Sequence, residues 1–155
     1  MSIRFLGDSR IYWSKAYEGI YHPLREMGIF PQNAQTFMFC ACLGFKYNRS
    51  VPVAGPTNDM RLTTFTENEV IPYVTIAFSK EGMQFEQLGQ IEGFKHIVEA
   101  YAEGGMQEFI ERFLDPYLIR GGDGTYILDI KNSSLDFEKD LLVFIYEEMN
   151  NVNLF

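Results

Sequence analysis

Four basic side chains and a tyrosine are the residues of this chain whose types come nearest to a binding site. Lys46, Tyr47 and Arg49 lie within "FKYNRS", Arg61 follows soon after, and Arg10 lies near the start of the chain. Cations beside an aromatic ring can hold a phosphate while the ring stacks on a base. The same groups can meet an acidic patch on a protein, including the acidic part of this chain. The sequence therefore leaves three interpretations open: nucleic-acid contact, protein contact or an unengaged surface.

The net charge of −8 is spread unevenly along the 155 residues. Residues 1–61 carry seven Lys or Arg against four Asp or Glu, a net charge of +3. Residues 62–155 carry the other six cations and seventeen acids, a net charge of −11. Long-range attraction of the whole molecule to nucleic acid is therefore weak, and only a local basic face would provide it.

Two cysteines, Cys40 and Cys42, raise the question of a redox or metal site. On a helix, residues at i and i+2 point roughly 200° apart, so the two thiols cannot hold one ion together. Metal sites use C-x₂-C-type spacing with a second pair of ligands, and thioredoxin-like proteins use C-x-x-C. Neither pattern is present, and we interpret both thiols as packed side chains.

No other pattern predicts a catalytic site. His22 and His96 belong to no H-E-x-x-H, G-x-S-x-G or Cys–His signature. The segment Arg120–Thr125, "RGGDGT", could form an anion-binding nest, but it lacks the Lys-Ser/Thr ending of a P-loop and is typical of a tight turn. Asp129 and Lys131 in "LDIK" faintly match a nuclease carboxylate cluster. The sequence predicts no metal and no cofactor.

The element that must position the basic loop (residues 46–49) is "PQNAQTFMFCACLGF". It predicts a helix with Asn33 as N-cap and Gly44 just past its end. Because its residues are apolar on all sides, the helix is expected at the centre of the core. It spans only about 15 Å, too short for a bilayer of about 30 Å. We expect a buried helix that presents Lys46 and Arg49 outward.

The remaining periodicity predicts further helices. In the first two thirds of the chain we expect a short helix over Ser9–Gly19, a turn at His22-Pro23, a short strand in "RLTTF", and a kinked helix that a capping box of Thr66 and Glu69 opens and Gly82 ends. After that we expect one helix that stops at Gly104-Gly105 and a second that ends at Pro116. A turn at Gly122–Gly124 with a strand follows. The last helix starts at Ser134 or Asp136, and one of its faces carries Phe137, Leu141, Phe144, Ile145 and Glu148. The predicted fold class is mainly α: a single compact helical domain over 1–155 with a central buried helix. Whether the domain also contains a small β-hairpin stays open at this point.

The setting predicted for the chain is the cytoplasm. Its two cysteines cannot build a disulfide framework, "MSIRFLGDSR" has no apolar run of signal-peptide length, and no stretch of about 18 apolar residues occurs. We expect no membrane partner, and the oligomeric state stays open.

Several motifs resemble a known family. "FMFCACLGFKYNRSVPV", then "RLTTF" and "IVEAYAEGGMQEFIERF" are similar to small accessory proteins encoded beside bacterial DNA phosphorothioation (Dnd) gene clusters. Those proteins show an apolar helix ending in Ala-Leu-Gly-Phe/Tyr, a basic loop with R-x-P, and later EYA-x-GG. The likeness covers about residues 34–114, and "RSVP" departs from it by placing two residues between Arg49 and Pro52. The resemblance implies a role in a DNA-modification or restriction system that defends against phage, and it supplies no catalytic residues.

The leading hypothesis is a non-catalytic accessory subunit whose partners are other protein subunits of a defence complex. Its contact surface would be Lys46, Tyr47, Arg49 and Arg61, supported by Arg10. One alternative is direct binding of DNA or RNA through the same residues. The other is a metal-dependent nuclease.

Overall fold

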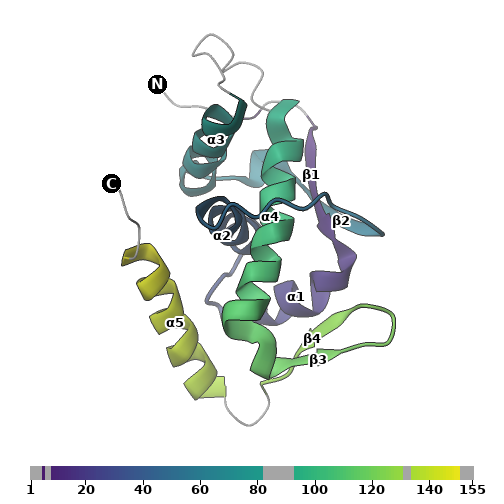
Figure 1. Cartoon of the computed structure of the whole chain (residues 1–155), viewed down its shortest axis with the longest axis vertical. Helices are drawn as coiled ribbons and strands as arrows, with labels where there is room; N and C mark the ends of the chain where they lie inside the picture. The colour runs from purple at the N-terminus through teal and green to yellow at the C-terminus, as the bar shows by residue number, and fades with distance from the viewer. Residues whose placement is uncertain (1–4, 6–7, 82–92, 131–133, 151–155) are drawn as a thin grey trace.

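The computed structural model describes residues 5, 8–81, 93–130 and 134–150, and within them the protein is mainly helical (Figure 1). The α-helices are α1 (Glu18–Met27), α2 (Asn33–Lys46), α3 (Glu67–Glu81), α4 (Lys95–Phe109) and α5 (Ser134–Asn150). Strand β1 (Arg10–Ser14) pairs antiparallel with β2 (Thr57–Arg61), and β3 (Leu118–Arg120) pairs antiparallel with β4 (Tyr126–Leu128). Single turns of 3₁₀ or π-helix are η1 (Lys15–Tyr17), η2 (Leu62–Thr64), η4 (Ile110–Leu114) and η5 (Asp115–Tyr117). The predicted fold class is confirmed. No helix among the described residues is long and apolar enough to cross a membrane.

Helices α2 and α4 cross at the centre of the protein, and the other elements pack around them (Figure 1). Helix α2 fully buries Phe37 and Cys40, as expected for a helix that is apolar on almost every side. The central buried helix is therefore confirmed. Its predicted ends were wrong, since Gln32 is the N-cap, Asn33 is already helical and the helix runs through Gly44.

The segment Ser9–Gly19, predicted as one helix, holds strand β1, the turn η1 and the start of α1. Ile11 and Trp13 are buried, whereas Tyr12 between them faces outward. This period of two, with β-branched and aromatic side chains, is that of a half-buried strand. Pairing with β2, distant in the sequence, outweighs the irregular helical spacing that favoured a helix.

The turn predicted at His22-Pro23 was wrong, because both residues lie inside α1. Ile20 and Leu24 on the same helix are fully buried, and this burial stabilises the helix despite the proline. The helix ends one turn later at Gly28, which takes the left-handed conformation with a φ of 81°.

The segment after β2 follows the prediction in part. "RLTTF" is not a strand, since β2 ends at its first residue and Leu62–Thr64 forms a 3₁₀ turn. Helix α3 then begins directly after Thr66, and half of the predicted capping box is present, since the Thr66 N–H lies 3.5 Å from the Glu69 carboxylate. The other half is replaced: the Thr66 hydroxyl donates to that carboxylate at 2.7 Å, and the Glu69 N–H donates to the Thr66 carbonyl at 3.0 Å. Pro72 lies inside α3. Gly82, the predicted terminator, lies outside the described residues.

Helix α4 does not stop at Gly104 and Gly105, as the sequence predicted, but continues to Phe109. A π-helical turn carries the chain on to Leu114, and Pro116 lies in the 3₁₀ turn that follows. The proline therefore ends the helical run where it was expected to. The glycines have another role, which the packing of α2 explains below.

The last part of the chain agrees closely with the prediction. Strands β3 and β4 form the hairpin, with Gly124 in its turn at a φ of 83°. Helix α5 lies beside the lower half of α4 and fully buries Phe137 and Leu141 (Figure 1). Phe144 is stacked on Phe109, with ring centroids 5.9 Å apart. The predicted inward face of α5 is thus confirmed.

Candidate functional site

A tight turn at the end of α2 sets the direction of the basic loop. Asn48 adopts a left-handed conformation with a φ of 53°. The Arg49 N–H donates to the Gly44 carbonyl at 2.8 Å, and the Asn48 N–H donates to the carbonyl three residues before it at 3.3 Å. This is the Schellman motif, in which Asn is one of the few residues that can replace Gly. The Val51 N–H then donates to the Ala100 carbonyl at 3.0 Å, so the chain after α2 lies across α4 (Figure 1).

Three glycines let α2 and the basic loop approach the backbone of α4. A Cβ atom on Gly105 would collide with the carbonyl oxygen of Cys40, and one on Gly44 would collide with the carbonyl oxygen of Tyr101. A Cβ atom on Gly104 would collide with the backbone of the basic loop. Only glycine permits such contacts. The glycines that were predicted to end helices are therefore the residues that bring the loop against α4.

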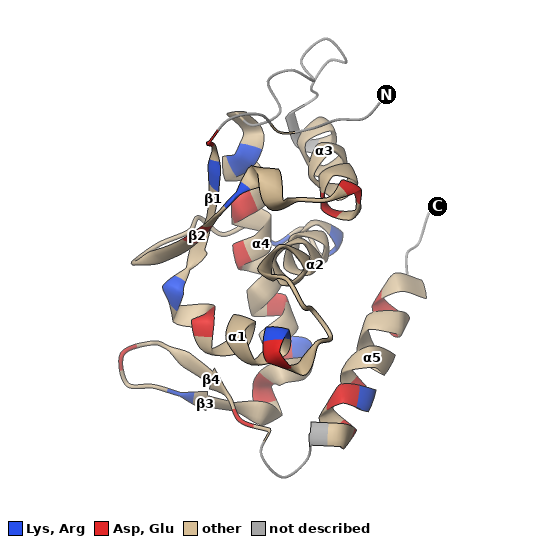
Figure 2. Cartoon of the chain, turned by 180° about the vertical axis from the view of Figure 1, so that it is seen from behind, with Lys and Arg blue, Asp and Glu red and all other residues tan. Residues whose placement is uncertain are grey.

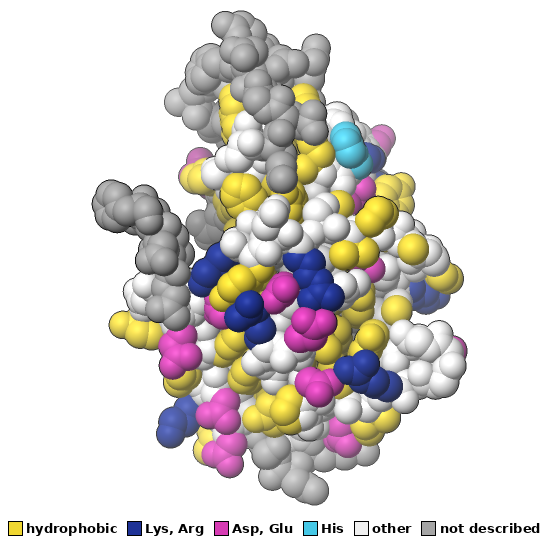
Figure 3. All heavy atoms as spheres, in the orientation of Figure 1, with side chains coloured by type: hydrophobic (Ala, Val, Ile, Leu, Met, Phe, Trp, Pro, Cys, Tyr) yellow, Lys and Arg dark blue, Asp and Glu magenta, His cyan; other side chains and the backbone are white. Residues whose placement is uncertain are grey.

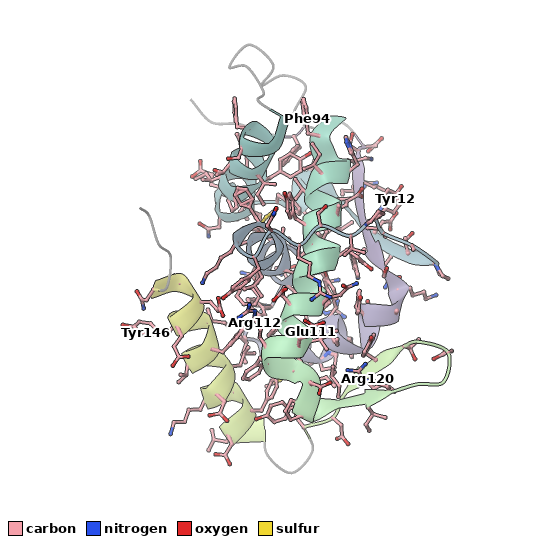
Figure 4. The ribbon with its side chains drawn as sticks, in the orientation of Figure 1. Tyr12, Phe94, Glu111, Arg112, Arg120 and Tyr146 are labelled. Carbon is pink, nitrogen blue, oxygen red and sulfur yellow. The ribbon has the colours of Figure 1, made fainter. Side chains whose placement is uncertain are left out.

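Arg49 is held by polar side chains at the end of α4 and in η4. Its Nη1 and Nη2 atoms lie 2.8 and 3.1 Å from the two carboxylate oxygens of Glu111, a bidentate pair. Nη2 also donates to Gln107 at 2.8 Å, and Nη1 lies 3.4 Å from a carboxylate oxygen of Glu108. The hydrogen bond from Arg49 lowers the pKa of Glu111, which lies on the open face of the helix (Figure 4). Both terminal nitrogens of the guanidinium group are thus engaged within the chain.

Lys46 and Tyr47 meet a single carboxylate of α5. Lys46 Nζ lies 2.7 Å from Oε2 of Glu148, and the Tyr47 hydroxyl donates to the same oxygen at 2.6 Å. Arg112, labelled in Figure 4, lies over the Tyr47 ring, 3.5 Å from its centroid. Its Nε donates to Glu108 at 2.6 Å. Although desolvation acts in the opposite direction, the hydrogen bonds from Lys46 and Tyr47 lower the pKa of Glu148. The carboxylate is therefore ionised at neutral pH.

These contacts form one ion-pair network on one face of the protein. The network consists of Lys46, Tyr47, Arg49, Gln107, Glu108, Glu111, Arg112 and Glu148. Figure 3 shows basic and acidic side chains alternating at the centre of this face. The structure therefore brings three of the five predicted site residues together and pairs them with the acidic part of the same chain. That they bind a partner stays a prediction.

An apolar groove of about 900 Å³ adjoins the network, between α2, α3 and the end of α5. Phe39 of α2, Ile71 of α3 and Met149 of α5 contribute to its walls. Lys46 and Glu148 also line it, and these two charged groups are paired with each other. Its size is within the range of about 300–1,000 Å³ that ligand sites have, and its lining suits an apolar segment.

The two thiols point in different directions, as the helical spacing predicted, but the interpretation of both as packed side chains is right for Cys40 and wrong for Cys42. Cys40 is fully buried, whereas Cys42 is exposed on α2 and lines the groove. Burial raises the pKa of Cys40 far above its ordinary value and desolvation raises the pKa of Cys42 to about 11. Both thiols are therefore protonated at neutral pH, which makes them weak nucleophiles. Within the described residues no three His, Cys, Asp or Glu side chains gather as metal ligands.

Arg10 and Arg61 lie elsewhere, at the end of the β1–β2 sheet. They are directly opposed in the register, and Arg10 lies 3.4 Å from a carboxylate oxygen of Asp59. Lys95 adds a third cation and lies over the Tyr12 ring, 5.5 Å from its centroid. Figure 2 shows the basic positions of β1, β2 and α4 close together at one end of the protein. This group meets the first turn of α4 and the basic loop meets its last, so roughly 20 Å of helix separates them.

A row of α4 side chains fixes the free edge of β1. Lys95 Nζ donates to the first β1 carbonyl at 2.8 Å, Glu99 accepts the N–H of Tyr12 at 2.7 Å, and Glu103 accepts the Ser14 hydroxyl at 2.6 Å. Four residues of the helix advance about 6.0 Å and two residues of the strand about 6.6 Å. Every fourth side chain of α4 therefore lies next to every second residue of β1. The row therefore determines where the sheet end with its arginines lies.

The other residues considered for chemistry have ordinary surroundings. A His22 ring nitrogen lies 2.9 Å from an Arg25 guanidinium nitrogen, and His96 is exposed. In Arg120–Thr125 the N–H groups of residues 121 and 124 bond to carbonyls inside the turn, at 2.8 and 3.2 Å, so the predicted tight turn is confirmed. Asp129 follows β4, and Lys131 lies outside the described residues.

A comparison with protein families decides the relationship of this chain. A family model described as DNA sulphur modification system-associated protein 4 matches residues 10–117. The match runs from the start of β1 to the end of η5 and covers more than half of the chain. The chain belongs to this family. The resemblance predicted over residues 34–114 is thereby confirmed and extends to β1. Searches of curated proteins and of solved structures gave no match.

The family match ends before α5, yet α5 supplies Glu148 to the network. No sequence motif predicted Glu108, Glu111 or Arg112 as site residues, and these three complete the network with Gln107. Two features of the sequence point to the network. One is the opposite net charge of residues 1–61 and 62–155, and the other is the i, i+4 spacing of Glu108 and Arg112. Neither feature identifies the partner of Arg49, because that contact depends on how α2 crosses α4.

Proposed function

We propose that this protein is a non-catalytic accessory subunit of a DNA sulphur modification system and acts by contacting other proteins of that system. The family is associated with such systems, which supports an accessory role. The proposal adds the manner of action, protein contact without catalysis.

The observation that carries the proposal is the pairing of the basic loop with the chain's own carboxylates. Lys46 and Arg49 each form an ion pair with a glutamate at 2.7–2.8 Å. A phosphate backbone attracts cations whose charge is free to replace its counterions. Since these cations are already neutralised, this face offers a polyanion little. A balanced polar surface next to an apolar groove is instead typical of protein interfaces.

The groove supplies the apolar part of the contact. Ile71 is 65% exposed on α3 and forms part of its wall. Grooves between helices bind apolar segments of partner proteins in many complexes. We therefore assign the groove and the adjoining ion-pair network as the surface for another subunit of the system.

The test is recovery of partner subunits with the tagged protein from cells that carry the complete system. Wild type is expected to recover DNA sulphur modification or restriction proteins of that system. Ile71→Glu is expected to lose them, because it places a charge in the groove wall. Ile119→Glu is the matched control, since Ile119 is 52% exposed on β3 and away from the groove. Wild type recovered alone would contradict the proposal.

One observation favours the alternative of direct nucleic-acid binding, through a different surface. Arg10, Arg61 and Lys95 lie together beside the ring of Tyr12, which is 36% exposed. Cations around an exposed ring can hold phosphates while a base stacks. The ion pair of Arg10 with Asp59 and the net charge of −8 both weaken this attraction.

Titration with a DNA oligonucleotide at several salt concentrations separates the two candidates. If the sheet end binds phosphates, the double change Arg10→Ala with Arg61→Ala should reduce the slope of log affinity against log salt by about two. Lys139→Ala on α5 is the control and should leave the slope unchanged. Binding that is absent or insensitive to salt removes this candidate.

A further inference from the structure

Helix α5 exposes a second apolar face, opposite the one packed on α4. Leu135, Leu142, Val143 and Tyr146 are 79%, 52%, 48% and 69% exposed, and Met149, which lies at the edge of this face and also lines the groove, is 69% exposed. Leu135, Leu142 and Met149 recur every seven residues and Tyr146 lies between them, which is the spacing of a helix-pairing seam. Figure 4 shows Tyr146 pointing away from the rest of the protein. A stripe of this kind on a soluble protein marks an interaction surface.

Acidic residues border the stripe on both sides. Asp136, Asp140 and Glu147 follow one border at helical spacing, and Glu138 lies on the other. The three on the first border are exposed. Lys139 lies within the stripe, where its hydrocarbon stem adds apolar surface. Shallow hollows between the side chains of Leu135, Leu142 and Tyr146 lie along this face.

We propose that this face of α5 docks an amphipathic helix of another protein, with an apolar stripe bordered by Lys or Arg. The apolar stripe would cover the exposed side chains, and the cations would meet the acidic borders. Charge complementarity of this kind selects the partner and speeds its association. The 17 residues of α5 extend about 25 Å, which accommodates a partner helix of four to five turns. This inference rests on the proposed function, since it adds a surface and a partner chemistry to the accessory role.

A second copy of the chain is a poor occupant of the same face. Both borders of the stripe are acidic, so pairing two α5 helices in either orientation places carboxylates opposite carboxylates. Like charges across an interface are unfavourable. Lys139, the cation within the stripe, does not offset four carboxylates. The charges therefore favour a basic helix from a different protein.

Two designed peptides test the chemistry of the occupant. Both are 17-residue model helices with leucine at heptad positions, and one carries lysine along the borders while the other carries glutamate. The lysine peptide is expected to bind the full chain at least about tenfold more tightly by fluorescence anisotropy, and its affinity should fall as salt rises. Equal binding of the two peptides would overturn the inference.

Matched variants separate docking on α5 from general attraction to an acidic protein. Leu142→Lys and Ile127→Lys add the same charge at residues that are both 52% exposed, one on α5 and one on β4. Leu142→Lys is expected to weaken peptide binding at least about tenfold, and Ile127→Lys by less than about twofold. Equal effects of the two changes would contradict docking on α5. Thermal melting of each variant confirms that it is folded.

Asp140→Lys and Glu26→Lys form the corresponding pair for the acidic border. Both positions are exposed, on α5 and on α1. Only the α5 change is expected to remove most of the salt dependence. Light scattering of the protein alone tests whether a second copy of the chain covers this face. A dimer that Leu142→Lys dissociates would show that it does and would refute the proposal.

Purified proteins of the same sulphur modification system then distinguish failure of this inference from failure of the proposed function. Binding by wild type and loss with Leu142→Lys supports both. Binding that Leu142→Lys leaves unchanged rejects the α5 surface and keeps the accessory role. Binding of the lysine peptide alone, without any protein of the system, keeps the α5 surface and rejects the proposed function.

Discussion

Two of the helices around α4 and η4, α2 and α5, are held by different forces. Helix α2 meets α4 backbone to backbone at Gly44 and Gly105, and the basic loop does so at Gly104, where an added Cβ atom has no room. Helix α5 meets the same helical run through large rings, with Phe144 stacked against Phe109 and Phe113. The first contact depends on the absence of side chains and the second on their presence.

This difference shows which region fixes the site and which region is free to vary. A backbone contact allows one arrangement, so it determines where the basic loop lies. A contact between side chains tolerates repacking, and a helix held in that way can carry a different outer face without disturbing the core. The family match includes the first contact and ends before α5, which agrees with this division.

The largest expected effect comes from filling the α2–α4 contact. Gly105→Ala should lower the free energy of unfolding by about 3 kcal/mol or more, since the new methyl group collides with the Cys40 carbonyl oxygen. Chemical denaturation measures the change. Gly122→Ala is the control, because a Cβ atom added there would meet nothing within 4 Å, and it should change stability by less than about 0.5 kcal/mol. Similar values for the two variants would show that the helices can move apart.

A smaller loss is expected from the α4–α5 contact. Phe144→Ala should cost about 2 kcal/mol, less than a fully buried phenylalanine, because its ring is only partly buried between Phe109 and Phe113. The change is measured in the same denaturation experiment. Tyr146→Ala, on the exposed side of α5, should have almost no effect. If Phe144→Ala destabilised the protein as much as Gly105→Ala, the two contacts would be equally rigid.

The end of α2 gives a third, smaller effect. Asn48→Ala should cost about 1 kcal/mol, because alanine takes the left-handed conformation at φ 53° less readily than asparagine. Asn48→Gly keeps the conformation accessible and should cost less than about 0.5 kcal/mol. Thermal unfolding of both variants measures the difference. An equal loss in both would mean that the asparagine side chain, and not its backbone, stabilises the turn.

The smallest effect concerns Glu103, which joins α4 to β1. Burial raises the pKa of Glu103 above its ordinary value of 4.5, although its hydrogen bond with Ser14 acts in the opposite direction. Because the folded protein then binds the proton more tightly than the unfolded chain, stability falls as pH rises from 4.5 through the raised pKa. Glu103→Gln keeps an acceptor for Ser14 and removes this loss. The variant should gain stability relative to wild type as pH rises, measured by melting at several pH values; parallel curves would contradict the pKa shift.

The sequence predicted the helical elements best where apolar residues recur at helical spacing without competing signals. Helix α5 is one example, and the start of α3 directly after Thr66 is another. It misplaced the first strand, since the decisive partner of β1 lies more than forty residues away in β2. The prediction that Gly104 and Gly105 end a helix was also wrong. Glycine does end helices, but here Gly104 and Gly105 lie inside α4 because another backbone needs the space.

The amino-acid sequence by itself determined that a buried apolar helix carries a short basic loop, and that the two parts of the chain have opposite net charge. Those features follow from the type and order of residues alone. Only the tertiary structure decided that Arg49 meets Glu111 and that Lys46 meets Glu148, while Arg10 and Arg61 lie together at the end of the β1–β2 sheet. The reason is that an ion pair needs its atoms within a few ångströms, and the crossing of α2 over α4 sets those distances.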